Sequence, residues 1–172
     1  PTIKGLTADG TPYQGVLYAG LMVTEEGPKL IEYNCRFGDP ECQPLMTRLE
    51  TDALELLLAT AEGQLDRVKP KWSKHAALTV VMAAKGYPGS YEKGTEIKGV
   101  EEAASIDGIT VFHAGTRREN GKLLAQGGRV LNVTAMAPSV KEAQEKAYAA
   151  VSKIDWPEGF CRTDIGCRAV ER

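Results

Sequence analysis

Apolar and polar residues alternate from Ile31 to Phe37 in a segment that begins at Leu30, a pattern typical of a β-strand with two different faces. We expect the apolar face to pack into a core, and its members are Ile31, Tyr33, Cys35 and Phe37. The polar face of the same strand carries Glu32, Asn34 and Arg36. The turn formers at 38–41 follow directly, so the polar face lies where the strand ends.

A second apolar run covers residues 14–24 and is separated from the first by a turn at 26–28. Two extended segments joined by a short turn predict an antiparallel hairpin. Gly15 and Gly20 interrupt the first strand, and a β-bulge is the simplest account of them.

Two helical segments are expected next. Leu45, Met46 and Leu49 have helical spacing, and a second helix is predicted to begin at Asp52, with Glu55 completing a capping box. Gly63 suits its C-terminal end. We expect its apolar stripe to belong to a core, and the stripe consists of Leu54, Leu57, Leu58 and Ala61.

Residues 66–74 are typical of a linker, and strands dominate the pattern after it. Strands are predicted at 76–84, 109–114 and 129–135, with a hairpin turn at 119–122. Ser139 and Glu142 form a second capping box, which opens a helix to about residue 154. The tail from Trp156 is expected to be irregular. The packing stripe of the last helix is Ala143, Ala147, Ala150 and Val151.

The chain is therefore expected to divide near residue 70, with an α+β fold built from antiparallel strands and helices. We place the first domain at 1–70, including the polar-faced strand, and the second at 71–172.

The polar-faced strand could bind a metal ion. Glu32 and Asn34 offer two oxygen ligands, and Mg²⁺ often takes only one or two from protein, with water and nucleotide phosphate supplying the rest. Arg36 could hold a phosphoryl group by two-point contact. Asp39 and Glu41 could hold an amine or a second metal ion. An exposed strand with surface ion pairs explains the spacing equally well.

A weaker signal is Gly127-Gly128-Arg129, where an arginine beside glycines could contact a phosphate on the substrate.

The net charge of −2 provides no basic surface, which argues against nucleic-acid binding. We find no apolar run that could span a bilayer, and no signal peptide at this start. The four cysteines lack zinc-site spacing, so we expect free thiols in a cytoplasmic protein.

Several motifs together resemble the glycinamide ribonucleotide synthetase family. The run IEYNCRFGDPECQ is similar to the signature of that family. Other blocks match in the same order along essentially the whole chain, namely YQGVLYAGLM, VVMAAKGYPGSYEKG, VFHAGT, GGRVLNVTA and RTDIGCRA. The resemblance implies the C-terminal part of an ATP-grasp domain followed by a small α+β C-terminal domain.

The resemblance also implies a function in purine biosynthesis. ATP, with Mg²⁺ or Mn²⁺, would phosphorylate glycine to glycyl phosphate, and phosphoribosylamine would attack it to give glycinamide ribonucleotide, ADP and phosphate. Glu32 and Asn34 match the metal ligands of the family, and Arg36 would steady the transferring phosphoryl group. Asp39, Glu41 and Arg129 are expected to contact substrates.

The family has an N-terminal region upstream of the part that this chain resembles, and the chain contains no nucleotide-binding glycine-rich motif of its own. We therefore expect the missing N-terminal part of the enzyme as a partner, and no activity from this chain alone. Two alternatives stay open: another ATP-grasp carboxylate–amine ligase, and a non-catalytic packing or binding fragment.

Overall fold

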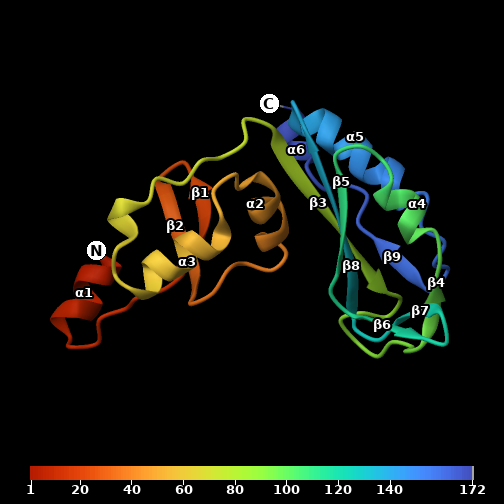
Figure 1. Ribbon diagram of the computed structural model, residues 1–172, viewed down its shortest axis with the longest axis horizontal. Coiled ribbons are helices and arrows are strands. Elements are labelled where there is room, and N and C mark those ends of the chain that lie inside the picture. The colour runs from red at the N-terminus through yellow and green to blue at the C-terminus, as the bar shows by residue number, and fades with distance from the viewer. Residues whose placement is uncertain (172) are drawn as a thin grey trace. The chain divides into compact units, whose positions relative to one another are not determined.

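The computed structural model describes residues 1–171 and contains two compact units (Figure 1). Unit 1 consists of Pro1–Asp39 and Leu49–Trp72, and unit 2 consists of Pro40–Arg48 and Ser73–Arg172. The segment Pro40–Arg48 thus belongs to unit 2, although residues of unit 1 precede and follow it in the sequence. The mixed fold with antiparallel strands confirms the predicted α+β class.

Unit 1 contains a two-stranded antiparallel sheet, β1 (Tyr18–Thr24) and β2 (Gly27–Asn34), which confirms the predicted hairpin. The register shifts between Gly20 and Leu21, so the predicted bulge is present at Gly20. Strand β1 begins at Tyr18 and not at residue 14, so Gly15 lies before the strand and the predicted start was wrong. The connecting turn lies at residues 25–26, slightly before the predicted one. Strand β2 ends at Asn34, and the chain then bends, so the prediction of a strand as far as Phe37 was wrong.

The prediction that the apolar face of β2 is buried was also wrong. Ile31 is 64% exposed and Tyr33 is 44% exposed. Cys35 is exposed as well, and Phe37 is only partly buried. The physical reason is that alternation places these side chains on one face of the strand but supplies no layer to cover them, and a two-stranded sheet has no core of its own.

The helices of unit 1 are α1 (Thr2–Ala8), which was not predicted, and α3 (Ala53–Ala61). Helix α3 begins as expected, because the Asp52 side chain accepts a hydrogen bond from the Leu54 amide. It ends as expected too, since Gly63 has a φ of +69°. The amides of Gly63 and Gln64 donate to the carbonyl groups of Thr60 and Ala59, which is the Schellman arrangement.

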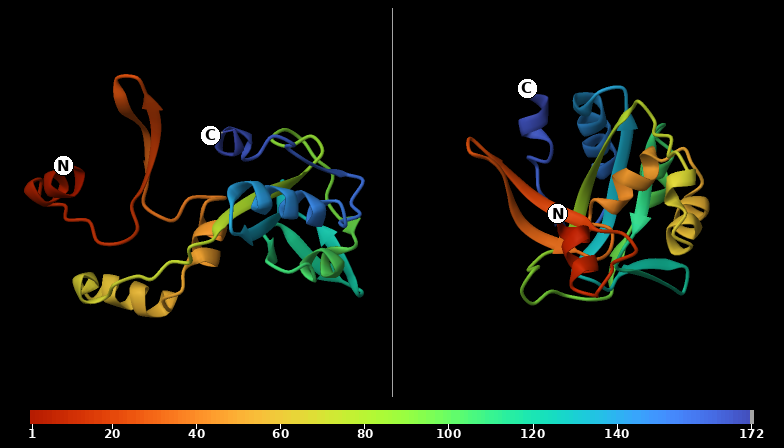
Figure 2. Two further views of the ribbon diagram at one scale, coloured as in Figure 1. Left: turned by 90° about the horizontal axis from the view of Figure 1, so that it is seen from above. Right: turned by 90° about the vertical axis from the view of Figure 1, so that its left-hand side faces the viewer.

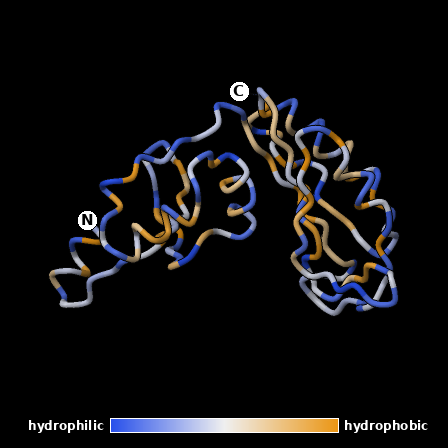
Figure 3. Tube along the Cα trace, viewed as in Figure 1, coloured by the Kyte–Doolittle hydropathy of each residue, from blue (hydrophilic) through white to orange (hydrophobic). Residues whose placement is uncertain are grey.

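The apolar stripe of α3 does not reach a core within the described chain, contrary to prediction. Leu54 is 71% exposed, and Leu57 and Leu58 are exposed too, whereas Ala59 is buried. Figure 3 shows the hydrophobic positions along this helix and along the hairpin. The predicted linker contains a short 3₁₀ helix, η1 (Leu65–Arg67), and Leu49 forms an isolated bridge with Trp72.

Unit 2 is built on a four-stranded antiparallel sheet. Its order is β5 (Ile109–His113), β8 (Arg129–Ala137), β3 (Ala76–Ala84) and β9 (Gly159–Cys161). The three longer strands were predicted from the sequence. The short strand β9 lies in the tail that was expected to be irregular, and it pairs with the end of β3.

One face of this sheet forms the core, and α5 (Val140–Val151) packs on it. The Ser139 side chain accepts a hydrogen bond from the Glu142 amide, as the capping box predicted, but the helix ends at Val151 rather than near residue 154. The alanine face of the helix is fully buried, which allows close contact with the sheet. Core residues on the two central strands are Leu78, Val80, Met82, Leu131, Val133 and Ala135.

The opposite face of the two central strands is mixed, with Thr79, Asn132 and Thr134 beside the apolar Val81 and Met136. Thr79 and Thr134 are cross-strand partners, and their hydroxyl groups lie 2.8 Å apart. Helix α2 (Cys42–Arg48) packs against the same strands, and the views show it on the side away from α5 (Figures 1 and 2). The Arg48 guanidinium donates to the Ser73 carbonyl group and so joins α2 to the start of the second segment of unit 2.

A three-stranded sheet completes unit 2, with the order β4 (Thr95–Ile97), β7 (Lys122–Ala125) and β6 (Thr116–Glu119). Asn120 and Gly121 connect β6 to β7 with φ values of +49° and +78°, which confirms the predicted two-residue hairpin. Two short helices, α4 (Val100–Ala104) and α6 (Cys167–Val170), were not predicted.

The different burial of the two units predicts different responses to truncation. Leu131→Ala should lower the free energy of unfolding by about 2 to 5 kcal/mol, because the leucine is fully buried. Leu54→Ala should change it by about 0.5 kcal/mol or less, because that side chain is exposed. Urea unfolding followed by circular dichroism compares the two variants. An equal loss of stability in both would contradict a core confined to unit 2.

Candidate functional site

Glu32 and Asn34 lie side by side at the end of strand β2. The amide nitrogen of Asn34 donates to Oε1 of Glu32 over 2.9 Å. Gly20 is opposite Glu32 on the neighbouring strand, and a Cβ atom there would lie 3.2 Å from Cγ of Glu32. The glycine therefore leaves space for the carboxylate beside the bulge.

This pair can supply the oxygen ligands of a hard cation. The second carboxylate oxygen of Glu32 and the amide oxygen of Asn34 are both outside the bond that joins the two side chains. Within residues 1–171, no group of three or more His, Cys, Asp or Glu side chains could hold a metal ion. A carboxylate and an amide therefore fit an ion that takes few protein ligands and keeps positions for water and phosphate, as Mg²⁺ does.

Arg36 does not lie on the strand with the other two residues, because β2 ends at Asn34. Its Nη1 atom donates to the carbonyl group of Phe37 over 2.8 Å, so the side chain turns toward the following backbone. The rest of the guanidinium fork is exposed and can donate to an anion.

Asp39 and Glu41 lie in the turn that follows, and both are exposed. Asp39 belongs to unit 1, whereas Glu41 belongs to unit 2. The Glu41 carbonyl group accepts from the Leu45 amide at the start of α2, so the backbone of this acidic turn is continuous with the helix.

Arg129 begins strand β8 and is partly buried. Gly128 before it is packed closely, because an added Cβ atom would meet the rings of Tyr87 and Tyr91. The Ala84 amide donates to the Gly128 carbonyl group over 2.8 Å. Close packing of the backbone against the two rings therefore accounts for the glycine at this position.

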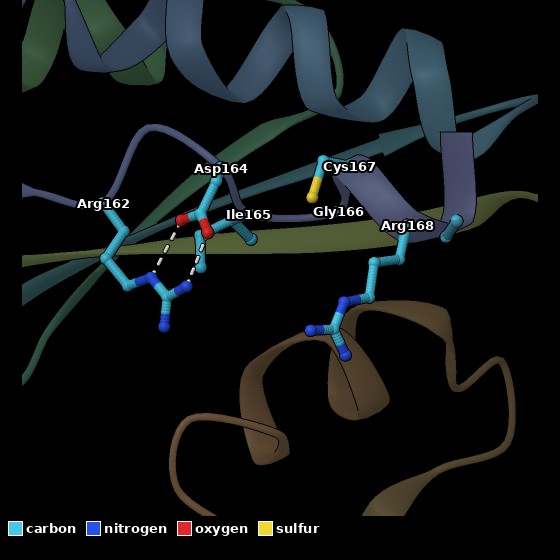
Figure 4. A pocket seen from close by; sticks show the side chains of 7 residues that line it. Arg162, Asp164, Ile165, Gly166, Cys167 and Arg168 are labelled. Carbon is cyan, nitrogen blue, oxygen red and sulfur yellow. Dashed lines mark hydrogen bonds and ion pairs between the residues drawn. The ribbon is translucent and has the colours of Figure 1, made fainter. Parts of the chain in front are cut away.

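Sequence reasoning missed a pocket on the C-terminal segment, although it noticed the RTDIGCRA block that forms it. The pocket has a volume of about 420 Å³ (Figure 4). Arg162 contacts Asp164 through two parallel bonds of 2.8 and 2.6 Å. The arginine–x–aspartate spacing was the available signal for this pair. The pocket is lined by Arg162, Asp164, Ile165, Cys167, Arg168 and neighbouring residues.

All four cysteines are free thiols in the structure. Burial raises the pKa of the Cys161 thiol above its ordinary value. Among residues 1–171, we find no helix with both the length and the apolar character needed to cross a membrane.

Two family models match the chain. Residues 77–168 match the C domain of phosphoribosylglycinamide synthetase, and residues 1–42 match its ATP-grasp (A) domain. The first match alone covers more than half of the sequence.

Curated relatives match over the whole chain. It is 60% identical to the phosphoribosylamine–glycine ligase of Mesorhizobium japonicum, covering all of this chain and 40% of that protein. It is 54% identical to the chloroplastic phosphoribosylamine–glycine ligase of Arabidopsis thaliana, covering all of this chain and 33% of that protein. The chain therefore spans well under half the length of these relatives.

Two solved structures are similar to this chain in fold. The phosphoribosylamine–glycine ligase of Thermotoga maritima matches with a TM-score of 0.79 and 34% identity, over 94% of this chain and 39% of that one. The N5-carboxyaminoimidazole ribonucleotide synthetase of the same organism has a TM-score of 0.56 and 18% identity, over 83% of this chain and 37% of that one. The latter is a likeness of fold alone. The chain belongs to the phosphoribosylglycinamide synthetase family.

Proposed function

We propose that the chain is part of a carbon–nitrogen ligase that joins glycine to phosphoribosylamine at the expense of ATP, in purine biosynthesis. The observation that carries the proposal is the 60% identity to a phosphoribosylamine–glycine ligase along the entire chain. The adjacent oxygen ligands of Glu32 and Asn34 support it independently, because nucleotide-dependent ligation needs a divalent cation beside the phosphates.

In this proposal the first step is phosphoryl transfer. A carboxylate oxygen of glycine attacks the γ-phosphorus of ATP, the bond to the bridging oxygen breaks, and ADP leaves. In the second step the amine of phosphoribosylamine attacks the acyl carbon of glycyl phosphate. Phosphate leaves with the electron pair of the broken carbon–oxygen bond, and the new amide nitrogen loses one proton.

Each candidate residue has a proposed part in these steps. Glu32 and Asn34 would hold Mg²⁺ or Mn²⁺, and such an ion would supply positive charge beside the transferring phosphoryl group. Arg36 donates to the same group, and its bond to the Phe37 carbonyl leaves further N–H donors for this role. Asp39, Glu41 and Arg129 contact the substrates.

We propose the rest of the ligase as the partner of this chain, since the chain spans 40% of its relatives. The surface that suits such a partner is the apolar surface of unit 1. Among the buried hydrophobic residues of the described chain, Ala59 alone comes from this unit. Its exposed apolar residues include Leu21, Met22, Val23, Leu30, Ile31, Leu54, Leu57 and Leu58.

The domain assignment follows the same proposal. Residues 1–70 would be the C-terminal part of the ATP-grasp domain, and residues 71–172 the C-terminal domain of the ligase. We also propose a cytoplasmic location, which free thiols support because disulfides are rare in reducing compartments.

The direct experiment measures ADP release that depends on ATP, Mg²⁺, glycine and phosphoribosylamine, with the chain alone and with the rest of the ligase added. Activity only after mixing supports the proposal. Activity of the chain alone would overturn the proposed need for a partner. No activity from a mixture that is shown to assemble would overturn the proposed ligase function and favour another ATP-grasp ligase or a non-catalytic fragment.

Glu32→Gln should lower kcat of the assembled ligase by about 100-fold or more, because a charged metal ligand becomes neutral while its shape is kept. The control is Glu26→Gln, which removes an exposed carboxylate paired with Lys29 on the same hairpin. Steady-state ADP release at saturating substrates measures both variants. A rate for Glu32→Gln equal to that of the control would remove Glu32 from the metal site.

Arg36→Lys should lower kcat by about 10- to 100-fold, because lysine keeps the charge but loses the planar fork of donors. Arg117→Lys is the control, since Arg117 forms an exposed ion pair with Glu119 in unit 2. The same assay serves. Unchanged turnover with Arg36→Lys would mean that the arginine only shapes the bend after β2.

The double variant Leu54→Ser, Leu58→Ser should weaken association with the rest of the ligase by about 100-fold, because two exposed leucines would lose their apolar burial in the complex. Isothermal titration calorimetry measures the Kd. Phe160→Ser is the control, because this exposed aromatic residue belongs to unit 2. Equal Kd values for the double variant and the unmodified chain would show that this face of α3 is not the contact surface.

A further inference from the structure

The pocket on the C-terminal segment has a fixed backbone. The Tyr148 hydroxyl group on α5 donates to the Arg162 carbonyl group over 2.8 Å and accepts from the Ile165 amide over 3.1 Å. Gln144 on the same helix donates to the Ile165 carbonyl group over 2.7 Å. These three bonds attach both sides of the segment to the helix that covers the core, so the pocket is a built feature and not a loose tail.

Gly166 holds the segment close to the sheet. Its φ is +83°, and an added Cβ atom would lie 2.6 Å from Cδ1 of Leu78 on strand β3. The left-handed conformation reverses the chain between Asp164 and Arg168. It thereby brings the side chains at both ends of the segment to one pocket.

Asp164 holds one of the two arginines in place. The Nε and Nη2 atoms of Arg162 bind the two carboxylate oxygens, so the plane of the guanidinium is fixed by a two-point contact. The hydrogen bond from Arg162 lowers the pKa of Asp164 below its ordinary value. The carboxylate is therefore charged at neutral pH, while Nη1 of Arg162 is not part of this contact.

Arg168 supplies a second positive charge on the same side. Figure 4 shows the side chains of Arg162 and Arg168 extending from the segment in the same direction. Among the interactions of residues 1–171, Arg168 has no hydrogen-bond or ion-pair partner of its own, although its charge also acts on Asp164. The pocket therefore holds two cations and one anion, in a chain whose overall charge is negative.

We propose that this pocket binds the phosphate monoester of phosphoribosylamine, an inference that rests on the proposed function. A phosphate dianion has three terminal oxygens, and arginine forks match such oxygens in both geometry and charge. The remaining charge of the pocket is positive and complements this dianion. Glycine suits the pocket less well, because its ammonium group would be repelled by both arginines. Asp164 is a positioning residue, since it acts on the ligand only through Arg162.

The first test is binding to the chain itself, with ribose 5-phosphate as the probe and ribose as its uncharged control. Amide resonances of residues 162–169 are followed by NMR during titration. We expect shifts in this segment with ribose 5-phosphate and none with ribose. Absence of shifts with ribose 5-phosphate would overturn the inference, whatever the activity of the assembled ligase.

A third titration with ATP in the absence of metal separates the two sources of phosphate. Weaker binding of ATP than of ribose 5-phosphate supports a site for the ribosyl substrate. Tighter binding of ATP in the same segment would overturn that assignment and place a nucleotide phosphate there instead.

The second test uses variants of the assembled ligase. Arg168→Ala should raise the KM for phosphoribosylamine by about 10- to 100-fold, because a charged hydrogen bond to the phosphate is lost, with KM values for ATP and glycine nearly unchanged. Arg168→Lys should recover part of the loss. Arg117→Ala is the matched control. Equal effects on all three KM values would overturn the inference.

Asp164→Asn tests the positioning role. It should raise the KM for phosphoribosylamine less than Arg168→Ala does, while leaving kcat at saturation unchanged. A fall in kcat with an unchanged KM would overturn this role. Failure of the proposed function remains distinguishable, because in that case the unmodified ligase releases no ADP, while ribose 5-phosphate binding by the chain is measured separately.

Discussion

The antiparallel pairing of β3 with β8 is the interaction on which the rest of unit 2 depends. Both strands are central, and their paired residues place an apolar row under α5 and a mixed row of polar and apolar residues on the other face. On that face the Thr79 and Thr134 hydroxyl groups hydrogen-bond to each other across the two strands. The second sheet and the C-terminal segment are attached to the layer formed by these strands and α5, which supports the pocket that contains Arg162.

Unit 1 has no comparable base. Its helix and hairpin are specified locally, by the Asp52 cap, the Gly63 termination and the bulge at Gly20. These local interactions define where each element begins, ends or bends, but they bury little apolar area. A two-stranded hairpin is only marginally stable by itself in water. The exposure of Leu54 and Ile31 follows from this difference. Local geometry and burial are separate requirements, and unit 1 satisfies the first without the second.

The same separation explains what the sequence could predict. Asn120-Gly121 and the Ser139 cap are short-range signals whose chemistry requires one backbone conformation, and both were predicted correctly. The phase of β2 was also correct, because Glu32 and Asn34 do share a face and touch. The predicted burial of β2 was wrong, because an alternating pattern indicates which residues share a face but not whether another layer covers that face. Short elements such as β9 and α6 carry too few residues for a periodic signal.

The sequence likewise predicted only part of the candidate site. Spacing placed the two oxygen ligands together, whereas the bend that takes Arg36 off the strand depends on where the ladder with β1 ends, at the pair Tyr18–Asn34. The pocket at Arg162 needed tertiary contacts from Tyr148 and Gln144, which are distant in sequence.

These two places differ in the support that their surroundings give them, and this difference bears on the proposed reaction. A binding pocket gains affinity when its donors are held before the ligand arrives, and the fixed segment of unit 2 meets that condition. We expect the proposed metal-binding strand, in a unit without a core, to become rigid only when its apolar faces are covered. Under the two proposals, capture of a phosphate would need unit 2 alone, whereas phosphoryl transfer at Glu32 and Asn34 would need the assembled enzyme. In the proposed function, the dependence of activity on assembly thus follows in part from where the hydrophobic core lies.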